Sequence, residues 1–365
     1  MAPFTPPWLL QSGLAMTLYT ALLAPRIWDQ TLQIPPLAYQ DHVFTGQGDV
    51  PIFGRWVGSS RRRGTIIATY GITGSLDNQW FLEILARKAH HRGYGVVLFD
   101  WRGHGKTGEL SPTLSSDGLY EGQDYLALAA TAKQLGCPPP YWLVGYSLSG
   151  QLALWGGREA MALPPGGGLE PQDIGGVAVV CPNLDANRSL RYLTAHPLGR
   201  YLERSIAREL RRLAEALHRA HPDHLDAAAI ARAHSIWTFD QELVIPRLGF
   251  ATVADYYAAS SPLPFMADLT VPTLILYAAD DPLFDPSIIP DLQGVCAANP
   301  QLHLVLTRHG GHVGYYSSAT GQHRSQDPDP WWAWNRVLDW VDQRSLVQES
   351  VAGSQGSAGK QAPGF

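Results

Sequence analysis

Short apolar, β-branched runs alternate with longer helical patterns from Gly64 onward. Such alternation is typical of βαβ units, in which buried parallel strands are joined by crossover helices. The sequence therefore predicts an α/β fold with a mostly parallel sheet and helices on both faces. An antiparallel hairpin is expected at the sheet edge, within 41–57. The predicted strands of the parallel series are 65–70, 95–99, 141–144, 176–180, 273–277 and 302–306.

This rhythm breaks between 181 and 271, where no strand pair is evident. The segment contains a long helical pattern at 201–219, with leucine and isoleucine at three- and four-residue spacing. A chain of 365 residues exceeds the roughly 250–300 residues at which single cores stop growing, so an extra piece is expected. We predict an N-terminal segment packed on the core (1–40), a first core part (41–182), a helical cap (183–270), a second core part (271–348) and a disordered tail (349–365).

The amino-acid composition and net charge limit the kinds of molecule that the chain is expected to bind. Hydrophobic residues make up 45% of the chain and charged residues 16%, with a formal net charge of −5, so nucleic acid is not an expected partner. Three cysteines, Cys137, Cys181 and Cys296, stand far apart without a CxxC pair. They predict neither a disulfide framework nor a zinc site, and they favour a cytoplasmic location.

The apolar run Trp8–Ala24 raises the question of a signal peptide or an anchor. No basic residue precedes it, polar residues interrupt it, and Pro25 ends it before the ~20 residues needed to span a bilayer. We expect an amphipathic segment packed on the body. Weak contact with a membrane surface is the alternative.

A nucleophile elbow is indicated at VGYSLSG, residues 144–150, where a predicted strand ends and a helix begins. Such a turn exposes the hydroxyl of Ser147 and requires small neighbours. The usual pattern has glycine two positions after the serine, whereas this chain has Ser149.

A base and an orienting carboxylate follow in the order Ser…Asp…His that is expected of an α/β-hydrolase. Asp281 lies after the strand 273–277, and we prefer it to Asp280 because it precedes a proline. His312 follows two glycines, and we prefer it to His309, for which a structural hydrogen bond is the alternative. A metal site at the two histidines is disfavoured, since no cysteine or carboxylate cluster accompanies them.

The oxyanion hole is expected in the loop YGITGS at 70–75, with the backbone N–H of Ile72 as one donor and that of Leu148 as the other. The turn DWRGHG at 100–105 is predicted to be structural. In that turn we expect Asp100 to pair with Arg102, and His104 to be exposed.

The chain resembles the YheT-like branch of the α/β-hydrolases over nearly its whole length. Two departures are Tyr70, where the family usually has histidine, and Ser149, where it has glycine. The resemblance implies hydrolysis of carboxylic esters or acylglycerols through an acyl-enzyme. The motifs that carry it are PPWLLQSG at 6–13, TLY at 17–19, the loop 70–75, the elbow, FD at 239–240, GF at 249–250, DYY at 255–257, SSP at 260–262, DP at 281–282, GHVG at 311–314 and WW at 331–332.

From these residues we expect a serine esterase or lipase-like hydrolase with the triad Ser147, Asp281 and His312 and without a cofactor or metal. The substrate is expected to be a small-molecule or lipid ester held under the cap. Two alternatives use the same chain: acyl transfer to an alcohol or thiol, and a catalytically degenerate binding protein. The sequence does not indicate an oligomeric state.

Overall fold

The computed structural model describes residues 2–358, with side chains described as far as residue 346. Its centre is an eight-stranded sheet. Short 3₁₀ helices span Trp8–Leu10, Trp28–Thr31, Gln47–Asp49, Pro171–Asp173 and Met266–Asp268, and a π-helical turn spans Asp240–Val244. The strands are β1 (Gln40–Thr45), β2 (Pro51–Val57), β3 (Thr65–Thr69), β4 (Gly95–Phe99), β5 (Tyr141–Tyr146), β6 (Ile174–Val180), β7 (Thr273–Ala278) and β8 (Leu302–Thr307).

The order across the sheet is β1-β2-β4-β3-β5-β6-β7-β8. Strands β3 to β8 run parallel to their neighbours, whereas β1 pairs antiparallel with β2, and β2 pairs antiparallel with β4. The mostly parallel sheet and its antiparallel edge are therefore as predicted. Because all the parallel strands end at the same edge, the loops after β3, β5, β7 and β8 meet there.

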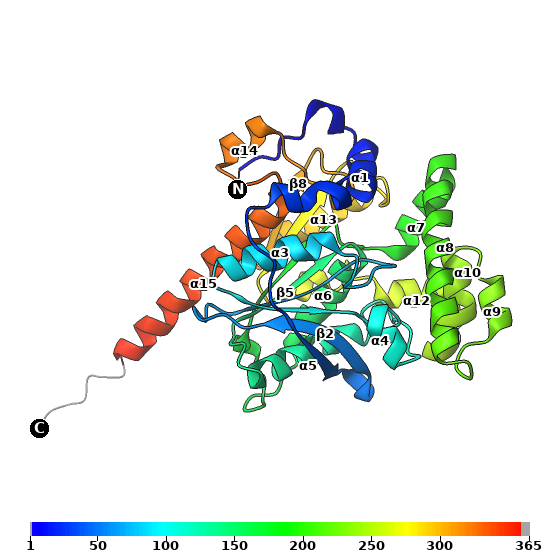
Figure 1. The fold of residues 1–365 in the computed structure, drawn as a ribbon, viewed down its shortest axis with the longest axis horizontal. Coiled ribbons are helices and arrows are strands. Elements are labelled where there is room, and N and C mark those ends of the chain that lie inside the picture. The colour runs from blue at the N-terminus through cyan, green and yellow to red at the C-terminus, as the bar shows by residue number, and fades with distance from the viewer. Residues whose placement is uncertain (1, 359–365) are drawn as a thin grey trace, which may run out of the picture.

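Helices cover both faces of the sheet (Figure 1). The alternation along β5 shows this directly, because successive side chains of a strand point to opposite faces. Trp142 packs edge-to-face on Trp340 of one helix, whereas Leu143 lies against Gly156 of another. The helices of the core are α3 (Trp80–His91), α4 (Gly105–Leu110), α5 (Glu121–Gln134), α6 (Leu148–Ala160), α13 (Ile288–Ala298), α14 (Ala319–Ser325) and α15 (Trp332–Ala358).

Six further helices lie between β6 and β7 in the chain, within the segment for which we expected a cap. Figure 1 shows several of them stacked at one side of the sheet. They bury a hydrophobic cluster of their own, which includes Leu210, Ala214 and Leu217 of α8 and reaches Leu114 of the core. These cap helices are α7 (Ala186–Ala195), α8 (Pro197–Ala220), α9 (Ala227–Arg232), α10 (Ile236–Phe239), α11 (Ile245–Leu248) and α12 (Val253–Ser260).

The N-terminal segment forms α1 (Gly13–Leu22) and α2 (Ala24–Ile27). Met16 of α1 is fully buried, while Trp8, Leu22 and Leu23 are exposed, so the segment is amphipathic. No helix among residues 2–358 is long and apolar enough to cross a membrane.

Helix α15 continues to Ala358, beyond the start of the segment 349–365 that we predicted to be disordered. The first part of that segment therefore forms helical backbone. Extending an existing helix costs little free energy, because the extension avoids the unfavourable nucleation of a new helix. Residues 359–365 lie outside the described part of the chain.

Candidate active site

Ser147 occupies a sharp turn between β5 and α6. Its backbone has φ 56° and ψ −126°, an unusual conformation for a residue with a side chain. The turn demands glycine at position 145, because a Cβ there would lie 2.1 Å from the carbonyl oxygen of Ser149. The N–H of Ser147 donates to the carbonyl of Val180 at 3.0 Å, which anchors the turn to β6.

Ser149 fits within this elbow and contributes hydrogen bonds to it. Its hydroxyl accepts a hydrogen bond of 2.7 Å from the N–H of Tyr146 and lies 2.9 Å from the carbonyl oxygens of Thr69 and Tyr146. The side chain is fully buried. Serine in place of the usual glycine therefore joins β3 to the elbow through its hydroxyl.

Loops after three strands bring Ser147, His312 and Asp281 together. Nε2 of His312 lies 2.8 Å from Oγ of Ser147, and Nδ1 lies 2.8 Å from Oδ2 of Asp281. The second oxygen of Asp281 accepts from the N–H of Leu283 at 2.9 Å. A hydroxyl, an imidazole and a buried carboxylate in this chain of contacts can deprotonate the hydroxyl and stabilise the resulting imidazolium.

The two residues that we considered as alternatives take neighbouring positions. Oδ1 of Asp280 accepts from the N–H of Gly311 at 2.9 Å, and Nδ1 of His309 lies 3.6 Å from Oδ2 of Asp280. Asp280 thus holds the glycine loop that carries His312.

Helix α1 packs directly against this loop. The N–H of His312 donates to Oγ1 of Thr17 at 2.8 Å. Contact is so close that a Cβ on Gly311 would lie 2.4 Å from the carbonyl oxygen of Gly13. The N-terminal segment is therefore part of the support of the site.

The loop after β3 lies over the elbow. A Cβ at Gly71 would lie 3.0 Å from the Cβ of Ser147, so this backbone approaches the serine closely. Ile72 and Leu148 both line the pocket beside Ser147. Among the described residues, neither of their N–H groups donates a hydrogen bond within the chain, which leaves both free for an oxygen of a substrate.

The position of His104 differs from the prediction. We expected it to be exposed, but it is 3% exposed and stacks on Trp101 with ring centroids 3.8 Å apart. Its Nε2 accepts from the N–H of Thr73 at 3.2 Å, so Nδ1 carries the proton and donates to the carbonyl of Arg102 at 2.9 Å. Burial lowers the pKa of His104 to about 4, which keeps the ring neutral.

The prediction that Asp100 pairs with Arg102 is wrong. Asp100 accepts from the hydroxyl of Tyr70 and from the N–H of Leu76, whereas Arg102 forms two hydrogen bonds with Asp124. A bidentate carboxylate on α5 satisfies the guanidinium better than a residue two positions away. The phenol of Tyr70, the residue that departs from the family's histidine, ties the loop after β3 to Asp100.

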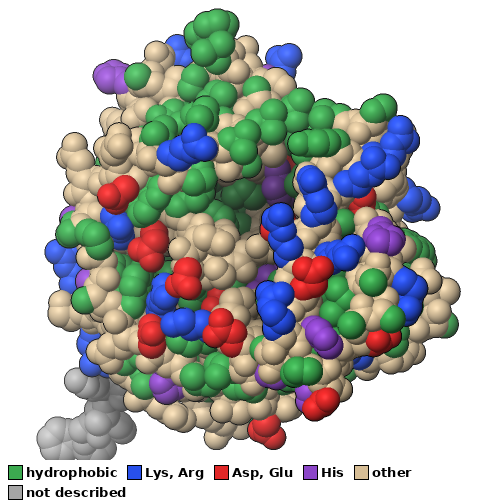
Figure 2. Space-filling model, turned by 45° about the vertical axis from the view of Figure 1, so that its right-hand side comes forward, with side chains coloured by type: hydrophobic (Ala, Val, Ile, Leu, Met, Phe, Trp, Pro, Cys, Tyr) green, Lys and Arg blue, Asp and Glu red, His purple; other side chains and the backbone are tan. Residues whose placement is uncertain are grey.

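An open pocket of about 980 Å³ adjoins Ser147, between the core and the cap; we call it the cap pocket. Figure 2 shows a hollow among hydrophobic side chains, with Lys and Arg side chains along its right rim. Cap helices supply most of the apolar wall. The apolar lining residues include Ile72, Leu114, Leu148, Leu190, Leu193, Ile206, Leu210, Leu213, Ile236, Phe239, Val244, Leu283 and Phe284.

No group of three or more His, Cys, Asp or Glu side chains within the described residues is arranged to hold a metal ion. His218 and His221 of the cap instead contact the carbonyl oxygens of Leu225 and Gly108.

Comparison with known proteins shows to which family the chain belongs. The family described as "alpha/beta hydrolase fold" matches residues 64–319. A Synechocystis protein named "Putative esterase slr0264" is 52% identical over 94% of this chain and 95% of its own length. The chain belongs to the α/β-hydrolase family.

Within the α/β-hydrolases it is a YheT-like member. The Escherichia coli protein "Putative esterase YheT" is 28% identical over 76% of each chain, which confirms the predicted resemblance. Together with the Synechocystis relative, it also confirms the prediction of a carboxylic ester hydrolase. The mouse protein "Phospholipase ABHD3" is 26% identical over 69% of this chain and 58% of its own length.

Solved α/β-hydrolase structures agree with the fold. The esterase Pf2001 of Pyrococcus furiosus has a TM-score of 0.52 at 17% identity and covers 79% of this chain and 88% of its own. An acylaminoacyl peptidase of Pyrococcus horikoshii also has a TM-score of 0.52, at 11% identity, over 88% of this chain and 43% of its own.

Proposed function

We propose that this α/β-hydrolase cleaves carboxylic esters through an acyl-enzyme on Ser147. The observation that carries the proposal is the continuous contact from Ser147 Oγ through the imidazole of His312 to Asp281, with both distances at 2.8 Å. His312 Nε2 takes the proton of the Ser147 hydroxyl as Oγ attacks the acyl carbonyl carbon. Asp281 accepts the Nδ1 proton in a hydrogen bond and stabilises the imidazolium.

The carbonyl oxygen becomes an oxyanion in this step, and the N–H groups of Ile72 and Leu148 are the proposed donors to it. Collapse of the tetrahedral intermediate breaks the bond to the alcohol oxygen, which takes the proton from His312 Nε2. Water then attacks the acyl group with His312 as the base, and its proton returns to Ser147 as the acid leaves.

The apolar lining of the cap pocket supports an ester with an extended apolar acyl chain as the substrate. The name of the mouse relative, a phospholipase, adds weight to a lipid ester. We also propose a cytoplasmic location, since Cys137 and Cys181 are buried as free thiols and Cys296 is also unpaired.

A fluorophosphonate probe tests the nucleophile. We expect it to label the wild-type protein at Ser147, and we expect Ser147→Ala to lose both labelling and hydrolysis of para-nitrophenyl esters. Ser60→Ala, at an exposed serine, is the matched control and retains both. Turnover that persists in Ser147→Ala, with the fold intact by circular dichroism, contradicts the assignment.

The same proteins and probe distinguish ester hydrolysis from the two alternative functions, acyl transfer and ligand binding without catalysis. A folded wild-type protein that resists the probe favours a binding protein. Product analysis with competing alcohol and thiol acceptors distinguishes hydrolysis from acyl transfer, because only transfer yields a new ester or thioester.

A further inference from the structure

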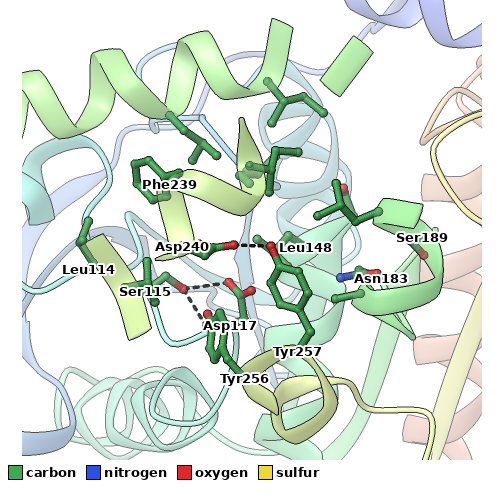
Figure 3. A pocket seen from close by; sticks show the side chains of 18 of the residues that line it. Leu114, Ser115, Asp117, Leu148, Asn183, Ser189, Phe239, Asp240, Tyr256 and Tyr257 are labelled. Atoms are coloured by element: carbon green, nitrogen blue, oxygen red, sulfur yellow. Dashed lines mark hydrogen bonds between the residues drawn. The ribbon is translucent and has the colours of Figure 1, made fainter. Parts of the chain in front are cut away.

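Two carboxyl side chains lie in the largely apolar wall of the cap pocket. Asp117 comes from the loop before α5, and Asp240 begins the π-helical turn Asp240–Val244 of the cap. Tyr256 and Tyr257 of α12 line the pocket beside them. Figure 3 shows the four side chains converging from the core and the cap. Neither carboxyl has a part in the proposed triad.

The two carboxyls are incompletely satisfied by the chain. Asp240 is 8% exposed, and its Oδ2 accepts from the hydroxyl of Tyr257. Its other oxygen has no hydrogen-bond donor among the described residues. The side chain of Asp117 forms a hydrogen bond with the side chain of Tyr256 and a long contact of 3.5 Å with the hydroxyl of Ser115. Its backbone, at φ 51°, is held in the strained left-handed region.

No free cation faces these carboxyls from the described lining of the cap pocket. Arg102 is the lining residue with a permanent positive charge, and Asp124 already binds it through two hydrogen bonds. His104 is neutral because burial lowers its pKa to about 4. Glu121 adds a further negative charge near Asp117.

Burial and the lack of a nearby positive charge affect the pKa of both Asp117 and Asp240. Burial, followed by the charge of Glu121, raises the pKa of Asp117, and burial, followed by the charge of Asp117, raises the pKa of Asp240. Each carboxylate therefore disfavours the ionisation of the other, and the pair lacks a positive partner. A ligand that carries one positive charge would supply that partner.

A second, independent feature of the same pocket also points to a ligand. The hydroxyl of Ser189, a residue 6% exposed, lines the pocket from α7 and has no hydrogen-bond partner in the described chain. The Oδ1 atom of Asn183, another lining residue, is buried and without a donor. Buried polar atoms are nearly always paired, so these atoms indicate a polar group that the chain itself does not provide.

We propose that Asp117 and Asp240, with the rings of Tyr256 and Tyr257, form a subsite for an ammonium group, and that the substrates are esters bearing one cationic amine. The carboxyls supply charge and hydrogen-bond acceptors, and the tyrosine faces supply cation–π contacts. The apolar walls hold the remainder of the chain. This inference rests on the proposed hydrolysis at Ser147 and specifies its substrate class.

Two pairs of isosteric esters test it. The first pair is para-nitrophenyl ε-aminohexanoate and para-nitrophenyl heptanoate, which place an ammonium or a methyl group at the end of the acyl chain. The second is butyrylcholine and its carbon isostere 3,3-dimethylbutyl butyrate, which has tert-butyl in place of trimethylammonium, so that the difference lies in the leaving group. We expect kcat/KM to favour the cationic member of at least one pair by about tenfold or more.

The ratio within a pair is the readout, so a general loss of activity in a variant cancels. We expect Asp240→Asn and Asp117→Asn to bring the ratio close to unity, whereas Asp223→Asn, at an exposed carboxylate of the cap, keeps it. A preference in the first pair places the cation in the acyl part, and one in the second pair places it in the alcohol part.

Wild-type ratios near unity in both pairs overturn the inference without any variant, while hydrolysis of the neutral esters and labelling of Ser147 leave the proposed function standing. A cationic preference that survives both Asp→Asn variants also overturns it. Inactivity toward all four esters, together with no labelling at Ser147, overturns the proposed function and the inference with it.

Discussion

The backbone N–H of His312 donates a hydrogen bond of 2.8 Å to Oγ1 of Thr17, a residue 295 positions earlier in the chain. Thr17 in turn donates to the carbonyl of Gly13 at 2.7 Å, which fixes the position of its oxygen. The N-terminal helix thus holds the loop that presents the imidazole to Ser147.

Thr17→Val should lower kcat by about tenfold and destabilise the fold by about 1–3 kcal/mol, because the N–H of His312 loses its acceptor in a partly buried position. Thr17→Ser keeps the oxygen and should retain most activity. Thr20→Val is the matched control, since the hydroxyl of Thr20 donates to the carbonyl of Met16 on its own helix and, among the described residues, makes no hydrogen bond to the His312 loop. Steady-state kinetics and urea unfolding measure both effects; equal behaviour of the two valine variants would refute the link.

Substitution of the two adjacent aspartates should separate their roles. Asp281→Asn should reduce kcat by about 10³–10⁴-fold, because an amide at Nδ1 of His312 no longer stabilises the imidazolium. Asp280→Asn retains an oxygen that can accept from Gly311, so we expect a loss of no more than about tenfold. Kinetics on one ester measure both variants, and the reverse order of severity would assign the acid to Asp280.

Ser149→Gly restores the family's usual residue and should nevertheless destabilise this chain. The change removes the buried acceptor of the N–H of Tyr146 and the hydroxyl that contacts Thr69, at a cost of about 1–3 kcal/mol. Urea unfolding followed by tryptophan fluorescence measures the difference. An unchanged midpoint would show that water replaces the hydroxyl.

His104 should make the stability depend on pH. Its folded pKa is lowered from 6.5 to about 4, so between these values the unfolded chain binds the proton and the folded chain does not. The contribution is complete above about pH 6.5 and is lost as the pH falls toward 4. A shift of this size corresponds to about 3 kcal/mol. His104→Gln should flatten this part of the profile of unfolding free energy against pH, and an unaltered profile would argue against the buried neutral ring.

Ile206→Trp should shorten the cap pocket, because Ile206 lines it from α8. We expect kcat/KM to fall more for long-chain than for short-chain para-nitrophenyl esters, by about tenfold at the longest chains that the wild type accepts. Arg204→Trp, on an exposed position of the same helix, is the control. A uniform loss across chain lengths in Ile206→Trp would place the acyl chain elsewhere.

The local sequence pattern was sufficient to predict the strands and the nucleophile elbow. Thr65–Thr69 and Gly95–Phe99 are buried along their whole length, and continuous β-branched or apolar runs of this kind have few other stable environments. Ser147 could be found because a strained strand-to-helix turn imposes small residues at fixed offsets, which remain visible in the sequence.

Residues whose roles depend on distant partners could not be placed in this way. His104 looked like an exposed turn residue because Gly103 and Gly105 flank it, yet stacking on Trp101 and the bond to Thr73 bury it. Arg102 found its carboxylate on α5 rather than in its own turn. Ser149 read as a departure from a motif, although its hydroxyl joins two strands.

The sequence by itself determined the α/β fold, the order of Ser147, Asp281 and His312 along the chain, and the place of the inserted helices, because hydrophobic periodicity and turn residues are local properties. Only the tertiary structure decided that Thr17 supports His312, that His104 holds the loop after β3, and that Asp117 and Asp240 meet in one pocket. Those contacts join segments that the sequence separates, and their energies arise from burial and from hydrogen-bond geometry that exist only after the cap and the N-terminal helix have packed on the sheet.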